Sequence, residues 1–67
     1  MKTMDETDLQ PDDVVVVCAF DEVPEHLFRV SDVYPDCVGG TAITGPLAGS
    51  YGEPSLEMIL RVHARNP

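Results

Sequence analysis

The apolar segment at residues 14–20 constrains the fold of this chain more than any other part of the sequence. It reads Val-Val-Val-Val-Cys-Ala-Phe, and four consecutive β-branched side chains favour a strand over a helix. The segment is also too short for a typical helix. Because it is apolar on both alternating faces, we expect a central strand, or one whose second face is covered by a partner chain or by a strongly curled sheet.

A second strand is predicted over residues 26–34, and it contains an irregularity. Val30 lies on the apolar face, but the next residue on that face is Asp32, while Val33 resumes the apolar pattern one position out of phase. A β-bulge near Ser31 and Asp32 restores the apolar face and bends the strand. Small barrels need bends of this kind to close.

Two alternative turns compete to follow this strand. Pro35-Asp36 suits the centre of a type I turn and leaves a third strand over residues 37–44. Gly39-Gly40 suits a two-residue primed turn, which matches the twist of a hairpin better but reduces the third strand to residues 41–44. We favour the first turn because it leaves a full-length strand, in which the two glycines allow coiling or close backbone approach.

The C-terminal part of the chain is ambiguous. Residues 45–54 contain three Gly and two Pro and are predicted to form a long loop. Residues 55–63 fit a strand in which only Ile59 breaks the alternation of apolar and polar residues. They also fit a short helix that begins after Pro54. In the strand, one face consists of Leu56, Met58, Leu60 and Val62; in the helix, the aligned residues are Leu56, Ile59, Leu60 and His63. We favour the strand and keep the helix as the alternative.

The remaining segments complete a single small domain. Residues 1–10 are predicted to form a flexible acidic arm in which only Leu9 covers the core, residues 11–63 one β domain, and residues 64–67 a tail. With 67 residues, of which 43% are apolar, the chain can bury only a marginal core. Its length and the lack of a long apolar run exclude a multidomain enzyme, a doubly wound α/β fold and a transmembrane helix.

These elements predict an all-β fold, either a small barrel or a strongly curled antiparallel sheet of four to five strands, with a short C-terminal helix as an open alternative. The segment Leu-Gln-Pro-Asp-Asp-Val-Val-Val at residues 9–16 is similar to the Leu-x-Pro-Gly-Asp opening of SH3-like small barrels, with Asp12 where Gly is usual. Residues 27–44 resemble their bent second strand, tight turn and third strand. The resemblance implies a fold but no functional residue, because this fold serves nucleic-acid, peptide and assembly roles alike.

The charge of the chain restricts its partners. Twelve Asp and Glu stand against four Lys and Arg, which gives a net charge of −8. This charge disfavours nucleic acids and anionic membranes, whose binding requires clustered cations, and it is compatible with a basic protein partner. Because Met1-Lys2-Thr3-Met4 is followed by Asp5-Glu6 rather than by an apolar segment, we expect a cytoplasmic location.

No set of residues predicts catalysis or metal binding. The four soft ligands, Cys18, His26, Cys37 and His63, lack the short paired spacing of structural zinc sites. In a reducing compartment we expect both cysteines to be free thiols, with a Cys18–Cys37 disulfide as the minority alternative. Neither Cys37 nor Ser50 or Ser55 is accompanied by a recognisable oxyanion-hole motif or third orienting group. We therefore expect no enzymatic activity and no cofactor.

The best candidate for a functional surface combines two unburied side chains with four carboxylates. Leu47 and Tyr51 lie in a polar loop, where they either cover the barrel mouth or serve as anchors for a partner. The predicted interaction surface consists of Leu47, Tyr51, Asp21, Glu22, Asp32 and Asp36.

We therefore expect a non-catalytic binding module that docks on a basic macromolecule, with a homodimer as one arrangement. Two alternatives remain open. The first is a nucleic-acid- or ribosome-associated domain, in which Arg29, Arg61 and Arg65 converge beside Tyr51 or Tyr34. The second is a metal- or ligand-responsive regulator that uses the cysteines and histidines.

Overall fold

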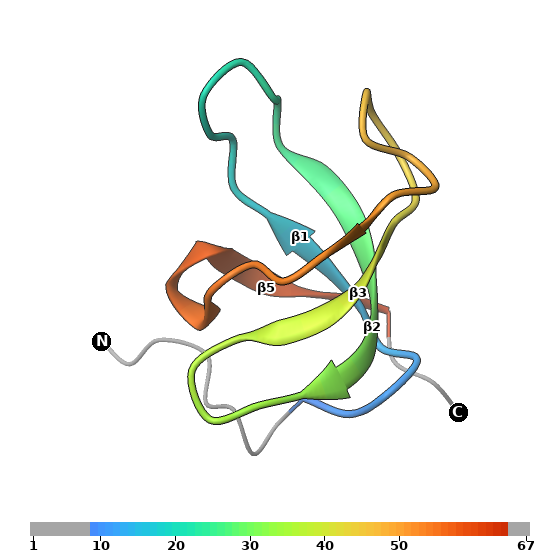
Figure 1. Ribbon diagram of the computed structural model, residues 1–67, viewed down its shortest axis with the longest axis vertical. Coiled ribbons are helices and arrows are strands. Elements are labelled where there is room, and N and C mark those ends of the chain that lie inside the picture. Colours follow the sequence, from blue (N-terminus) through green and yellow to red (C-terminus); the bar gives the residue numbers. More distant parts are fainter. Residues whose placement is uncertain (1–8, 65–67) are drawn as a thin grey trace.

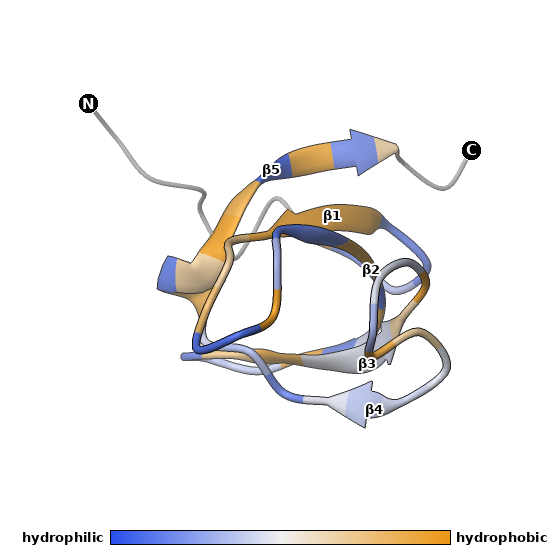
Figure 2. Ribbon diagram, turned by 90° about the horizontal axis from the view of Figure 1, so that it is seen from above, coloured by the Kyte–Doolittle hydropathy of each residue, from blue (hydrophilic) through white to orange (hydrophobic). Residues whose placement is uncertain are grey.

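A computed structural model describes residues 9–64 and places five antiparallel strands in one sheet of order β4-β3-β2-β1-β5. The strands are β1 (Val14–Val17), β2 (His26–Val33), β3 (Val38–Ala42), β4 (Tyr51–Gly52) and β5 (Ile59–Ala64). The sheet curls strongly, so that β4 and β5 lie on opposite sides (Figure 1; Figure 2). The predicted all-β class is confirmed. The curled sheet is the form observed, because no strand pairing joins β4 to β5 within the described residues.

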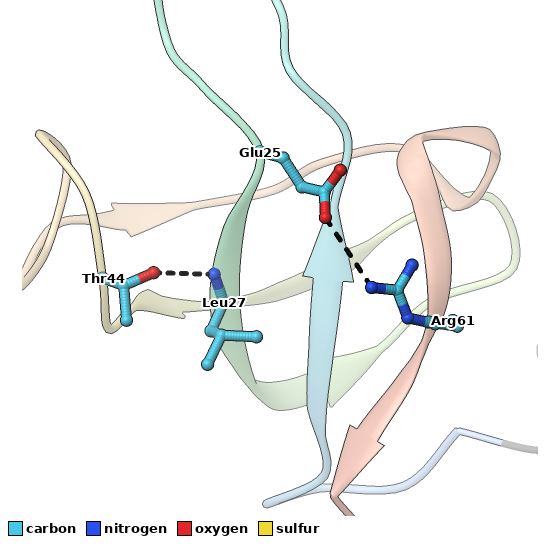
Figure 3. Close-up of polar contacts among 4 residues, drawn as sticks. All are labelled: Glu25, Leu27, Thr44 and Arg61. Carbon is cyan, nitrogen blue, oxygen red and sulfur yellow. Dashed lines mark hydrogen bonds and ion pairs between the residues drawn. The ribbon is translucent and has the colours of Figure 1, made fainter.

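The valine segment forms β1 at the centre of the sheet. Val15 and Val17 belong to the core, whereas Val16 points to the opposite face and is nevertheless only 3% exposed. Its register partners are Leu27 on β2 and Arg61 on β5. Arg61 reaches across β1 to the Glu25 carboxylate, with 3.7 Å between Nη2 and Oε2 (Figure 3). The second face of β1 is therefore covered by this chain's own side chains, including the long stem of Arg61.

The first strand is shorter than predicted, because the chain leaves the sheet after Val17. Phe20 and Val23 form an isolated pair in which each N–H donates to the other's carbonyl, at 2.9 and 2.7 Å. Asp21 stands between them with a positive φ of 49°. A tight hairpin tip thus replaces the end of the predicted strand.

The bulge predicted in the second strand is confirmed. Between Val30 and Asp32 the register with β3 shifts by one residue, so that Ser31 is the extra residue of β2. The strands approach closely here, because a Cβ on Gly40 would overlap the Arg29 carbonyl oxygen and lie 2.8 Å from a ring carbon of Phe28. Glycine is therefore required at the bend.

The predicted turn at Pro35-Asp36 is also confirmed. The Tyr34 N–H donates to the Cys37 carbonyl at 2.9 Å, and Val33 pairs with Val38 directly beyond it. The third strand is shorter than residues 37–44, since β3 spans Val38–Ala42.

The C-terminal part combines both alternatives, because a 3₁₀ turn (Leu56–Met58) precedes β5. Three members of the predicted apolar face, Leu56, Met58 and Val62, pack against the core. The prediction is wrong at two positions, because Ile59 is buried at 5% exposure whereas Leu60 is 47% exposed. Val17 pairs with Ile59 and Val16 with Arg61, so Leu60 is a bulged residue that points outward. The loop predicted over residues 45–54 also contains the short strand β4.

The N-terminal turn holds the start of β1 and is stabilised by its own hydrogen bonds. Leu9 is buried at 4% exposure, as expected for a residue that covers the core. The Gln10 N–H donates to Asp13 Oδ2 at 3.0 Å, and Asp12 has a positive φ of 75°. The rest of the predicted arm and tail, residues 1–8 and 65–67, lies outside the described residues. Cys18 and Cys37 are free thiols.

Candidate functional site

The six residues predicted to form the interaction surface are spread over both ends of the molecule. Asp21 and Glu22 form the tip of the β1–β2 loop, and Leu47 lies in the β3–β4 loop; both loops rise at the top of Figure 1. Asp36 lies in the β2–β3 turn, at the opposite end of the molecule (Figure 1). The structure therefore does not bring the six residues together on one surface.

One region is built on Gly39. This glycine pairs in register with Asp32, and a Cβ on it would overlap the Tyr51 hydroxyl and lie 3.4 Å from Cε2 of Tyr34. Both tyrosine side chains therefore lie over the same glycine, and they remain 60% (Tyr51) and 40% (Tyr34) exposed. We call this region the tyrosine surface; it comprises Asp32, Tyr34, Asp36, Gly39, Tyr51 and Glu53.

A hydrogen bond fixes the centre of the tyrosine surface. The Tyr51 hydroxyl donates to Glu53 Oε2 at 3.0 Å. This hydrogen bond, with partial burial and the nearby Glu53 and Tyr34, raises the pKa of Tyr51 to about 12. Tyr51 acts as the donor of this hydrogen bond, and Glu53 keeps its remaining acceptor capacity for a ligand.

Cys37 lies beside this surface in an acidic environment. Burial, and then the charges of Asp36 and Glu53, raise the pKa of its thiol above the ordinary value. The thiolate is the reactive form of cysteine, so these neighbours suppress its reactivity. The charges of Asp36 and Glu53 both raise the pKa of the Cys37 thiol. The β2–β3 turn, which carries Asp36, and the segment after β4, which carries Glu53, are therefore both near this cysteine.

The second region is an apolar cavity of about 350 Å³ between the two upper loops and the segment after β4. Its wall includes Phe20 from one loop, Leu47 from the other, and Met58 from the 3₁₀ turn. Its floor is the core itself, because Val17 and Phe28 also line it. We call it the open-side pocket, since it lies where the sheet fails to close. The other lining residues are His26, Ala42, Ser50, Tyr51, Gly52, Glu53 and Pro54.

The candidate metal ligands and bases are placed apart. His26 is buried at 6% exposure with Nδ1 2.8 Å from the Pro24 carbonyl oxygen, and its ring centroid lies 6.2 Å from that of Phe20. Within residues 9–64, no three His, Cys, Asp or Glu side chains are grouped so that they could hold a metal ion.

The two described arginines lie on different parts of the sheet. Arg61 pairs with Glu25 on the outer face of β1 (Figure 3). Arg29 pairs in register with Thr41, which in turn pairs with Tyr51, so Arg29 and Tyr51 belong to one cross-strand row with β3 between them. The third predicted member, Arg65, lies outside the described residues.

Sequence analysis placed Asp32, Asp36 and Tyr51 on the interaction surface and missed Glu53. It named Tyr34 only in the nucleic-acid alternative, and Gly39 only as a position of close backbone approach, which the structure confirms. Asp32 and Tyr34 are two residues apart on an extended segment, a spacing that places them on one face. This signal was present in the sequence. The positions of Gly39 and Glu53 depend on the β2–β3–β4 register, which the sequence alone did not define.

No protein-family model, curated protein or solved structure matches the chain. The described residues contain no helix with the length and apolar character needed to cross a membrane.

Proposed function

We propose that this chain is a non-catalytic binding module that holds a basic segment of another protein on its tyrosine surface. The observation that carries the proposal is the placement of Tyr34 and Tyr51 over Gly39, with Glu53 held by the Tyr51 hydroxyl. Two half-exposed aromatic rings bordered by carboxylates match the chemistry of Lys and Arg side chains, which bind aromatic faces and carboxylates together.

The charge of the whole chain supports the same class of partner. A net charge of −8 attracts a basic segment and accelerates its association at low salt. The range of this attraction is about 30 Å at 0.01 M ionic strength, and screening shortens it to about 8 Å at physiological ionic strength. The raised pKa of Cys37 supports binding rather than nucleophilic catalysis at this surface.

The experiment is a fluorescence-anisotropy titration of the full chain against a labelled nonapeptide with four Arg among Gly and Ser. We expect saturable binding at 20 mM NaCl that weakens strongly at 300 mM NaCl, because screening removes most of the attraction. Gly39→Ala, which displaces Tyr51 from its position, should weaken binding about fivefold, the equivalent of roughly 1 kcal/mol.

A charge-matched pair of variants distinguishes the surface from net charge. Glu53→Gln and Glu57→Gln remove the same charge, but only Glu53 belongs to the tyrosine surface. We expect Glu53→Gln to weaken binding several-fold more than Glu57→Gln. Equal effects, or binding that ignores salt, would contradict the proposal, as would tighter binding of single-stranded RNA than of the Arg peptide.

A further inference from the structure

The open-side pocket adjoins the tyrosine surface, but the proposed binding of a basic segment to that surface assigns no role to the pocket. Tyr51 and Glu53 belong to both regions, so a ligand lying on the tyrosine surface reaches the rim of the pocket. We infer that the pocket receives one large apolar side chain of the same basic segment, which makes the recognised sequence an apolar residue flanked by Lys or Arg. This inference rests on the proposed function and specifies its ligand.

The lining of the pocket fits an aliphatic or aromatic side chain. Phe20, Leu47 and Met58 are all partly exposed and surround the entrance, while buried side chains form the floor. A cavity of about 350 Å³ lies at the small end of the range for ligand pockets, roughly 300 to 1,000 Å³. It therefore suits a single side chain better than a folded element, and removal of that side chain from water provides the driving force.

Carboxylates near the pocket specify what flanks the anchor. Glu53 lines the pocket, and Asp21 and Glu22 directly follow Phe20, another lining residue, in the sequence. All three carboxylate residues are exposed, so they are accessible to an incoming ligand. An apolar pocket with acidic residues on two neighbouring segments is complementary to an apolar residue flanked by cations.

The test uses three labelled peptides of the form Arg-Arg-X-Arg-Arg, with X as Ala, Leu or Phe, titrated against the full chain at 20 mM NaCl. We expect the Leu and Phe peptides to bind about tenfold more tightly than the Ala peptide, because the larger side chains bury more apolar surface. Two exposed leucines supply matched variants: Leu47 lines the pocket and Leu60 lies on β5 outside it.

Leu47→Ala should reduce the preference for Leu over Ala to about threefold or less, whereas Leu60→Ala should leave it unchanged. Equal affinity for the three peptides would overturn the inference while salt-dependent binding of the Ala peptide still supports the proposed function. If none of the three peptides binds the wild-type chain, both the inference and the proposed function are overturned. Sedimentation showing a micromolar dimer that Leu47→Ala dissociates would overturn it too, because a second copy would then occupy the pocket.

Discussion

Among individual side chains, Tyr51 provides the most direct test of the tyrosine surface. Its folded pKa of about 12 lies above the ordinary value near 10, so the folded state favours the neutral phenol. The stability from this shift is complete below pH 10 and is lost as pH rises towards 12. Glu53→Gln replaces the charged acceptor of this hydrogen bond with a neutral amide, so we expect Tyr51 to titrate nearer to 10 in that variant.

Tyrosinate absorbance, with circular dichroism to verify the fold at each pH, measures this titration. Glu57→Gln serves as the control and should leave the high value unchanged. A single transition near the ordinary pKa for both tyrosines of the wild-type chain would show that the Tyr51–Glu53 hydrogen bond is not formed in solution.

Asp12 tests the turn before β1. Its φ of 75° places it in the left-handed region, and its N–H donates to the Val30 carbonyl at 2.6 Å. Asp tolerates this region better than a β-branched residue does. We expect Asp12→Val to lower the free energy of unfolding by about 1–2 kcal/mol, whereas Asp12→Gly should preserve or slightly raise it.

Urea denaturation of both variants measures the difference. Equal destabilisation by Val and Gly would indicate that the Asp12 side chain, rather than its backbone conformation, matters at this position.

Within the strands, β5 tests which of two adjacent apolar residues stabilises the fold. Ile59 is buried and Leu60 is a bulged, exposed residue. We expect Ile59→Ala to cost about 2–4 kcal/mol, because it removes buried methyl groups and leaves a cavity. Leu60→Ala should change stability by no more than about 0.5 kcal/mol. Chemical denaturation measures the stability cost of each variant. A larger cost for Leu60→Ala than for Ile59→Ala would contradict the observed burial and match the apolar face expected from the sequence.

The strands also show what sequence patterns could predict. The bulge at Ser31 and the turn at Pro35-Asp36 were predictable, because apolar alternation breaks at the first and proline fixes φ at the second. The burial of Ile59 in place of Leu60 was not, because it depends on the bulge at Leu60 in the pairing of β5 with β1. The two-residue strand β4 carries no periodicity at all, and only its partner β3 defines it.

For the protein as a unit, negative charge is the strongest electrostatic influence on stability. Repulsion among twelve acidic side chains opposed by four basic ones destabilises the compact state. We expect an increase from 20 to 500 mM NaCl to raise the melting temperature by about 5 °C, which corresponds to roughly 1 kcal/mol for a domain of this size. A double variant, Glu22→Lys with Glu57→Lys, roughly halves the net charge and should show a smaller rise. An equal rise in both proteins would assign the effect to ion binding or apolar burial instead.

The candidate site could be predicted only in part for a related reason. Acidic residues and an aromatic side chain in a polar loop are recognisable in the sequence as exposed groups, but the hydrogen bond between Tyr51 and Glu53 is not. Their grouping depends on which loops rise from the same end of a curled sheet, and that is a property of long-range strand pairing. Asp21 and Asp36 look equivalent in the sequence but lie at opposite ends of the molecule.

Within residues 9–64, β4 and β5 are not paired, and core residues form the floor of the pocket. An apolar ligand bound there packs directly against the core, so its affinity and the folding equilibrium are thermodynamically linked. At a hundredfold excess over its dissociation constant, such a ligand adds about 2.7 kcal/mol to native-state stability. Resistance to unfolding would then rank ligands by affinity, whether or not they carry a label and whatever their sequence.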